Sequence, residues 1–109
     1  MDLPRSVTEA DNGQTIEIAI GDTLEVSLPE TASTGFRWQI VSSGDPVCVI
    51  AADTRVPPGT AMPGAPGSHQ WRLEARKAGD SEFKLAYRRP WESGDAGREF
   101  SIRLRVVPK

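Results

Sequence analysis

Cys48 and His69 are the only cysteine and the only histidine in this 109-residue chain. A thiol beside an imidazole is the pair that cysteine nucleophiles use, because the imidazole accepts the proton and leaves the reactive thiolate. Cys48, however, lies in the apolar run of residues 47–50, which is typical of a buried and unreactive thiol. We therefore expect no catalytic residues, and we expect the protein not to be an enzyme.

Other chemistries lack the side chains that they need. One cysteine and one histidine give no spacing for a zinc site, and no Gly-Lys phosphate-binding motif is present, so we expect no metal and no cofactor. A single cysteine also excludes an intrachain disulfide. Residues 1–56 carry three basic and nine acidic side chains, and residues 57–109 carry ten and six. In a sandwich both halves contribute to each face, so we expect no nucleic acid partner.

Arg89, Pro90 and Trp91 form the segment best suited to binding a partner. Pro90 fixes its own φ and biases Arg89 toward extended backbone, so the tripeptide leaves its strand in a restricted geometry. Tryptophan and arginine are the residue types that dominate interface hot spots, which makes Trp91 a candidate anchor. The alternative is that Trp91 folds back and caps the end of the domain.

Two other turn-rich segments are candidate binding loops. In residues 31–36, Gly35 allows backbone conformations closed to other residues, and the hydroxyl side chains can bond nearby amides, which favours a tight turn. Residues 64–67 are rich in glycine and proline, a composition that many ordinary connections share. The candidate contact residues in these two segments are Thr31, Ala32, Ser33, Thr34, Gly35, Phe36, Gly64, Ala65, Pro66 and Gly67.

Alternating apolar residues predict the β-strands that position these loops. A period of two places one set of side chains in a core and the set between them in water. The predicted inward set is Ile16, Ile18, Ile20, Leu24, Val26, Leu28, Phe36, Trp38, Ile40, Trp71, Leu73, Ala75, Phe83, Leu85, Tyr87, Phe100, Ile102, Leu104 and Val106. Residues 47–52 could add a further strand, and no window of similar length has the stripe of an amphipathic helix.

About seven short strands separated by turns predict an all-β fold, an immunoglobulin-like antiparallel β-sandwich without a disulfide. A small open barrel fits the same alternation. We expect residues 1–13 to be a flexible N-terminal leader and residues 14–109 to be a single domain whose order starts near Gln14. The connections at 29–35, 53–70 and 88–98 can gather at one end of such a sandwich, where we expect binding.

The sequence contains no targeting signal that we can identify. Residues 1–20 lack the basic start and apolar run of a signal peptide, and no segment has the length of a membrane span. We expect a soluble chain without a membrane partner, cytoplasmic as written, or periplasmic or secreted if a leader was removed. The compartment and the oligomeric state stay open, with a monomer as the default.

In their order along the chain, the three candidate loops resemble the signature of the chagasin-like inhibitors of papain-type cysteine peptidases. Residues 89–91 match the family's Arg-Pro-Trp in full. Residues 33–36 and Trp38 match its Asn-Pro-Thr-Thr-Gly-Tyr-x-Trp pattern from the first threonine onward, with Thr31 and Ala32 in place of the usual Asn and Pro.

The match of residues 64–67 is weaker. Gly64 and Gly67 agree with the family's Gly-x-Gly-Gly, and Pro66 replaces the middle glycine, which removes a backbone donor and some freedom. Together the three matches lie within residues 29–91. Any one of these matches would be uninformative by itself. The resemblance depends on all three occurring in the family's order.

The resemblance implies a reversible, non-covalent inhibitor of papain-like cysteine peptidases that occludes the active-site cleft with three loops. Residues 33–35 would enter the groove, Trp91 would pack on one side, and residues 64–67 would touch the other wall. The alternative function is an immunoglobulin-like module that binds carbohydrate or a surface protein without inhibitory activity, with Trp71 and Trp91 as stacking platforms.

Overall fold

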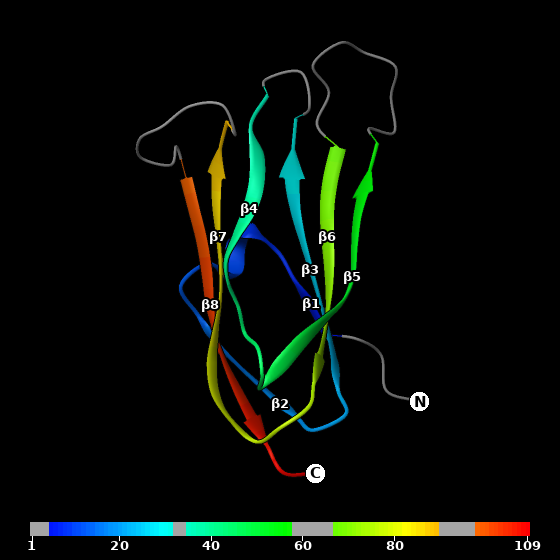
Figure 1. Cartoon of the computed structure of the whole chain (residues 1–109), viewed down its shortest axis with the longest axis vertical. Helices are drawn as coiled ribbons and strands as arrows, with labels where there is room; N and C mark the ends of the chain where they lie inside the picture. Colours follow the sequence, from blue (N-terminus) through cyan, green and yellow to red (C-terminus); the bar gives the residue numbers. More distant parts are fainter. Residues whose placement is uncertain (1–4, 32–34, 58–66, 90–97) are drawn as a thin grey trace.

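Two β-sheets packed face to face make up the computed structural model of the chain (Figure 1). The structure describes residues 5–31, 35–57, 67–89 and 98–109. Within these ranges there are eight strands and one short 3-10 helix, η1. Their bounds are β1 Arg5–Val7, η1 Glu9–Asp11, β2 Thr15–Ala19, β3 Thr23–Glu30, β4 Arg37–Ser43, β5 Cys48–Val56, β6 Gly67–Ala75, β7 Gly79–Arg88 and β8 Arg98–Val107.

The strand order is β1-β3-β6-β5 in one sheet and β2-β8-β7-β4 in the other. The four longer pairings, β3 with β6, β5 with β6, β4 with β7 and β7 with β8, are antiparallel. The two short N-terminal strands pair in parallel, β1 with β3 and β2 with β8. Two separate sheets confirm the predicted sandwich and exclude the alternative of a small open barrel.

The core lies between the sheets and consists mainly of the alternating residues that the sequence predicts. Trp71, Phe83 and Phe100 are each at most 1% exposed, and the rings of Trp71 and Phe83 meet edge to face with centroids 6.0 Å apart. Burial of such rings is the main favourable term in folding a domain of this size. Since the one cysteine of the chain is a free thiol, apolar packing holds the sheets together.

Ile40 departs from the predicted inward set, because its side chain is 43% exposed. The pairing of β4 with β7 shifts register between Ile40 and Ser42, and a bulge of this kind turns the side chains beside it away from the strand's regular alternation. Ile20 and Phe36 are only partly buried and pack against the margin of the core. The remaining residues of the predicted inward set are buried.

Part of the segment that we expected to be a leader forms a strand. Arg5–Val7 forms β1, pairs with β3, and buries Val7 to 1% exposure. The Gly13 N–H also donates to the carbonyl of Ser101 at 2.7 Å. Among the described residues, regular structure therefore starts at Arg5, ahead of Gln14. A three-residue strand with one buried apolar side chain is too short to leave a period-two signal.

The strands also reach further into the second connection than the expected 53–70 range. β5 continues to Val56, and its pairing with β6 runs as far as Val56 opposite Ser68. Asp53, Thr54 and Arg55 are exposed residues on an edge strand, so backbone pairing and not an apolar pattern makes them a strand. The described part of the chain contains no helix with the length and hydropathy of a membrane span.

Candidate functional site

Six strand ends meet at one end of the sandwich, at the top of Figure 1, where β3, β5 and β7 finish and β4, β6 and β8 begin. We call this the loop end. Eight of the predicted site residues lie outside the described residues, and the other five lie at this end or next to its strands. The eight are Ala32, Ser33, Thr34, Gly64, Ala65, Pro66, Pro90 and Trp91, and the five are Thr31, Gly35, Phe36, Gly67 and Arg89.

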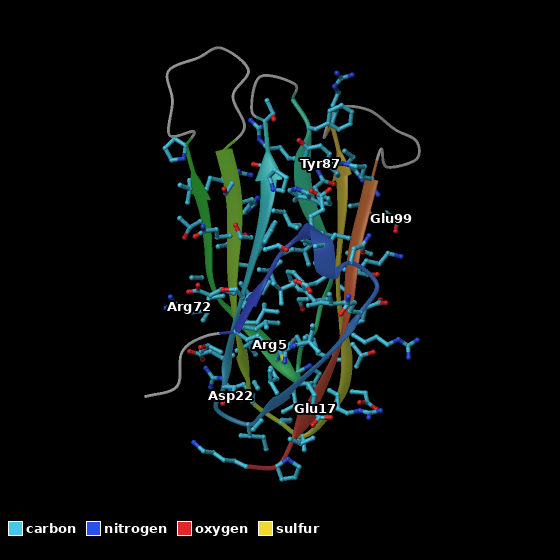
Figure 2. The ribbon with its side chains drawn as sticks, turned by 180° about the vertical axis from the view of Figure 1, so that it is seen from behind. Arg5, Glu17, Asp22, Arg72, Tyr87 and Glu99 are labelled. Atoms are coloured by element: carbon cyan, nitrogen blue, oxygen red, sulfur yellow. The ribbon has the colours of Figure 1, made fainter. Side chains whose placement is uncertain are left out.

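The described residues that flank the first and third candidate loops touch one another. The guanidinium carbon of Arg89 lies over the ring of Phe36, 4.5 Å from its centroid. The Phe36 ring stacks on Tyr87, with centroids 5.2 Å apart, and the backbone N–H of Thr31 donates to the Tyr87 hydroxyl at 3.3 Å. Tyr87 is labelled near this end in Figure 2. The segments on either side of the first loop are therefore neighbours of the segment that leads into the third.

Trp38 holds the strands on either side of the first loop together. Its indole N–H donates to the carbonyl of Pro29 on β3 at 3.0 Å, and its ring lies 4.6 Å from that of Tyr87 on β7. The side chain is 4% exposed. Trp38 thus links β4, which follows the loop, to β3, which precedes it.

Gly35 adopts φ +79°, the left-handed backbone region that favours glycine. A residue with a Cβ costs about 1–2 kcal/mol more there. The sequence-based expectation that this position needs glycine is confirmed. Gly67, from the second candidate loop, is paired with Glu30 at the end of β3, so the described margins of the first and second loops are adjacent in one sheet.

Sequence reasoning considered His69 only as a partner for Cys48 and did not place it, or Glu30, among the buried residues near the loops. Both are buried, at 6% and 3% exposure, and both occupy inward positions, Glu30 in line with Leu28 and His69 in line with Trp71. Continuing the predicted alternation by two residues along each strand would have placed them inside. A period-two search for apolar residues passes over polar side chains at the same positions.

A network of charged side chains surrounds the Glu30 carboxylate. It accepts hydrogen bonds from the backbone N–H of Trp38 at 2.9 Å, from Nε of Arg55 at 3.0 Å and from Nδ1 of His69 at 3.1 Å. The other ring nitrogen of His69 contacts the carboxylate of Asp53 on β5. The His69 ring also stacks on Trp71 with centroids 3.9 Å apart. The network therefore joins four strands just inside the loop end.

These partners change the acidity of Glu30. Burial by itself raises the pKa of the carboxyl, but the hydrogen bond from the Trp38 N–H, the bond and charge of His69 and the bond from Arg55 lower it further than burial raises it. The net pKa lies below the ordinary value of 4.5. Glu30 is accordingly ionised at neutral pH.

We expect Glu30 to make the fold less stable in acid. Because its folded pKa is lowered, its contribution is fully present above about pH 4.5, the unfolded value, and is lost as the pH falls through the folded value. Thermal unfolding of the wild type and of Glu30→Gln should differ at pH 7 and converge as the pH is lowered below 4.5. A difference in Tm that stays constant down to pH 2.5 would contradict the ionised state.

Cys48 and His69 do not form the thiol-imidazole pair that their types allow. Cys48 is fully buried, and burial raises the pKa of its thiol, which disfavours the thiolate. It pairs with Ala75, six residues along β6 from His69, which is about 20 Å at the rise of a strand. In the part of the chain that the structure describes, no cluster of His, Cys, Asp or Glu side chains has the arrangement of a metal site.

An immunoglobulin-like sandwich that brings three connections to one end has the architecture in which such domains carry their binding loops. The sequence model described as "Chagasin family peptidase inhibitor I42" matches residues 17–106. The chain therefore belongs to the chagasin family of peptidase inhibitors.

Individual relatives agree with this assignment. Chagasin from Trypanosoma cruzi is 30% identical over 95% of this chain and 99% of its own length. The crystal structure of the cysteine protease inhibitor EhICP2 from Entamoeba histolytica superimposes with a TM-score of 0.84 at 27% identity, covering 94% of this chain and 95% of that one. PbICP-C, solved in complex with falcipain-2, shares the fold, with a TM-score of 0.67 at 16% identity over 96% and 99% of the two chains.

Proposed function

We propose that this protein is a reversible, non-covalent inhibitor of papain-like cysteine peptidases that fills the active-site cleft with its loop end. The observation that carries the proposal is the match of residues 17–106 to a family of peptidase inhibitors. The contact of Arg89 with Phe36 supports it, because the described margins of the first and third candidate loops lie side by side as a single plug requires.

Three segments make the contacts in this proposal. Residues 31–36 enter the groove and cover the catalytic thiol, Trp91 with Arg89 and Pro90 packs on one side of it, and residues 64–67 touch the opposite wall. No bond forms between inhibitor and enzyme. A backbone turn that crosses the groove without offering an extended peptide to the nucleophile remains uncut.

Preorganisation is the physical basis of this mode of binding. Gly35 already holds a left-handed conformation, and Arg89, Phe36 and Tyr87 are already stacked beside it. Segments whose ends are fixed in the free protein lose less conformational entropy on docking, so more of the contact energy appears as affinity.

The alternative of a carbohydrate-binding or surface-protein-binding module has no comparable support. Trp71, one of its two proposed stacking platforms, is 1% exposed and packs against His69 and Phe83 inside the sandwich. A ring in that position has no free face for a ligand. Membership in the inhibitor family favours inhibition.

Titration against papain and a cathepsin-L-type enzyme with a fluorogenic substrate tests the proposal. We expect activity to fall linearly until one inhibitor is present per enzyme, to return on dilution, and to leave the inhibitor chain intact by mass spectrometry. A trypsin-like serine peptidase serves as the control and should keep its activity. Full activity of several papain-like enzymes at micromolar inhibitor, or a covalent adduct, would refute the proposal.

A further inference from the structure

Glu30 spans the base of the first candidate loop. It is the last residue of β3 and directly precedes Thr31, whereas Trp38 is the second residue of β4, on the far side of the loop. Oε2 of Glu30 accepts the backbone N–H of Trp38 at 2.9 Å. This bond fixes the distance between the two strands from which residues 31–36 emerge.

The same carboxylate also reaches the strands on either side of the second loop. Oε1 accepts a hydrogen bond from Arg55, which lies one residue before the end of β5, and Oε2 accepts one from His69, two residues into β6. We call the strand ends that flank a loop its stems. The Glu30 side chain therefore connects the stems of the first loop to the stems of the second.

His69 lies between two carboxylates, because one of its ring nitrogens faces Glu30 and the other faces Asp53. A carboxylate that is ionised only accepts hydrogen bonds, so the Glu30 carboxylate accepts from Nδ1 of the ring. Arg55 faces the same carboxylate from β5.

Stability alone gives a weak reason for this arrangement. Ion pairs inside a protein cost desolvation, and apolar residues of similar size are often as stabilising or more so. Position 30 continues the inward row of Leu24, Val26 and Leu28, where an apolar side chain would extend the core. An ionised carboxylate adds charge-assisted hydrogen bonds to three strands. Because these bonds have a defined length and direction, they fix the spacing of the strands.

We propose that Glu30 is a positioning residue for inhibition, which holds the stems of the first and second loops at the spacing that docking requires, with His69, Asp53 and Arg55 holding its carboxylate in place. The inference rests on the proposed function and deepens it. Glu30 itself is buried and does not touch the peptidase.

Glu30→Gln tests the proposal, because the amide keeps the shape and removes the charge and one acceptor. We expect the inhibition constant to rise at least about tenfold, mainly through slower association, since a smaller fraction of chains holds the loops in the docking arrangement. Stopped-flow measurement of the association and dissociation rates separates misplaced loops from lost contacts with the enzyme. Lost contacts would mainly raise the dissociation rate. An inhibition constant within twofold of the wild type would overturn the inference.

Two control variants separate positioning from general loss of stability. Glu25→Gln removes a charge from the same strand, where Glu25 pairs with Arg72 at 2.7 Å in an exposed position, and it should inhibit as the wild type does. Val106→Ala weakens the core near the end of β8, away from the loop end. If Val106→Ala lowers Tm as Glu30→Gln does and weakens inhibition equally, the positioning role is refuted.

The single histidine gives a spectroscopic readout, because its ring signals need no assignment among others. We expect the His69 ring signals and the Trp38 amide signal to shift in the ¹⁵N spectrum of Glu30→Gln, because both groups contact the Glu30 carboxylate. Unchanged His69 and Trp38 signals in a variant with weakened inhibition would contradict the mechanism.

A milder variant covers the case in which Glu30→Gln does not fold. The Arg55 side chain is 61% exposed, and Arg55→Gln removes one donor to Glu30 with little loss of core packing. We expect this variant to fold and to inhibit about threefold more weakly, and unchanged inhibition would overturn the inference. A wild type that inhibits no papain-like enzyme would instead refute the proposed function and this inference with it.

Discussion

Replacing Trp91 with alanine is expected to raise the inhibition constant by a factor of about 30 or more, equivalent to about 2 kcal/mol of binding free energy. A tryptophan that fills a pocket on a partner buries a large, rigid surface, and hot spots of this kind concentrate in tryptophan and arginine. Trp91 follows Arg89, whose guanidinium is already held over Phe36 in the free protein. The adjoining stem is therefore fixed before the enzyme arrives.

The inhibition assay needs a measurement of folding beside it, since Trp91 has an alternative role as a cap on the sandwich. As an anchor, it can be removed with the circular dichroism spectrum and Tm unchanged, and Trp91→Phe should retain part of the affinity. As a cap, its removal should lower Tm. A loss of affinity below tenfold in a variant that remains folded would count against Trp91 as the anchor.

Phe83→Ala is expected to have the largest effect on stability, about 3–5 kcal/mol. Phe83 is 0% exposed in the middle of β7, and its ring meets Trp71 from the opposite sheet. Truncation leaves a cavity between the sheets, and a domain of this class has only about 5–15 kcal/mol of total stability. With one cysteine, the chain has no intrachain disulfide to limit the loss.

Urea denaturation at neutral pH measures this effect. The midpoint should fall sharply with little change in the slope, which reports the surface exposed on unfolding. Phe83→Leu is the matched control, because it retains most of the side-chain volume and should lose much less. A cost below about 1.5 kcal/mol for Phe83→Ala would mean that the sheets do not pack around this ring as described.

Much of the fold could be predicted because period-two alternation is a direct record of burial in a sandwich. Trp71, Leu73 and Ala75 are buried as the pattern requires. The pattern failed where something other than side-chain burial decides the structure. A bulge exposes Ile40, and backbone pairing alone extends β5 to Val56.

The loops of the candidate site could be predicted from the sequence, but the contacts that hold their ends in place could not. Glycine at position 35 indicated a backbone conformation that other residues avoid, and Gly35 adopts a positive φ. The order of the three loop motifs indicated the family that the sequence model matches. The contact between Arg89 and Phe36 joins residues far apart in sequence, which no local pattern encodes. The contact between Glu30 and His69 was not predicted either, because it depends on which strands are neighbours, and His69 was considered only as a partner for Cys48.

The C-terminus lies at the far end of the sandwich from the loop end, because β8 starts among the loops and runs away from them (Figure 1). A carrier, fluorophore or solid support joined to Lys109 is accordingly held at the pole opposite the proposed contact surface. Immobilised through that residue, the protein can capture an enzyme from solution without steric interference from its tether.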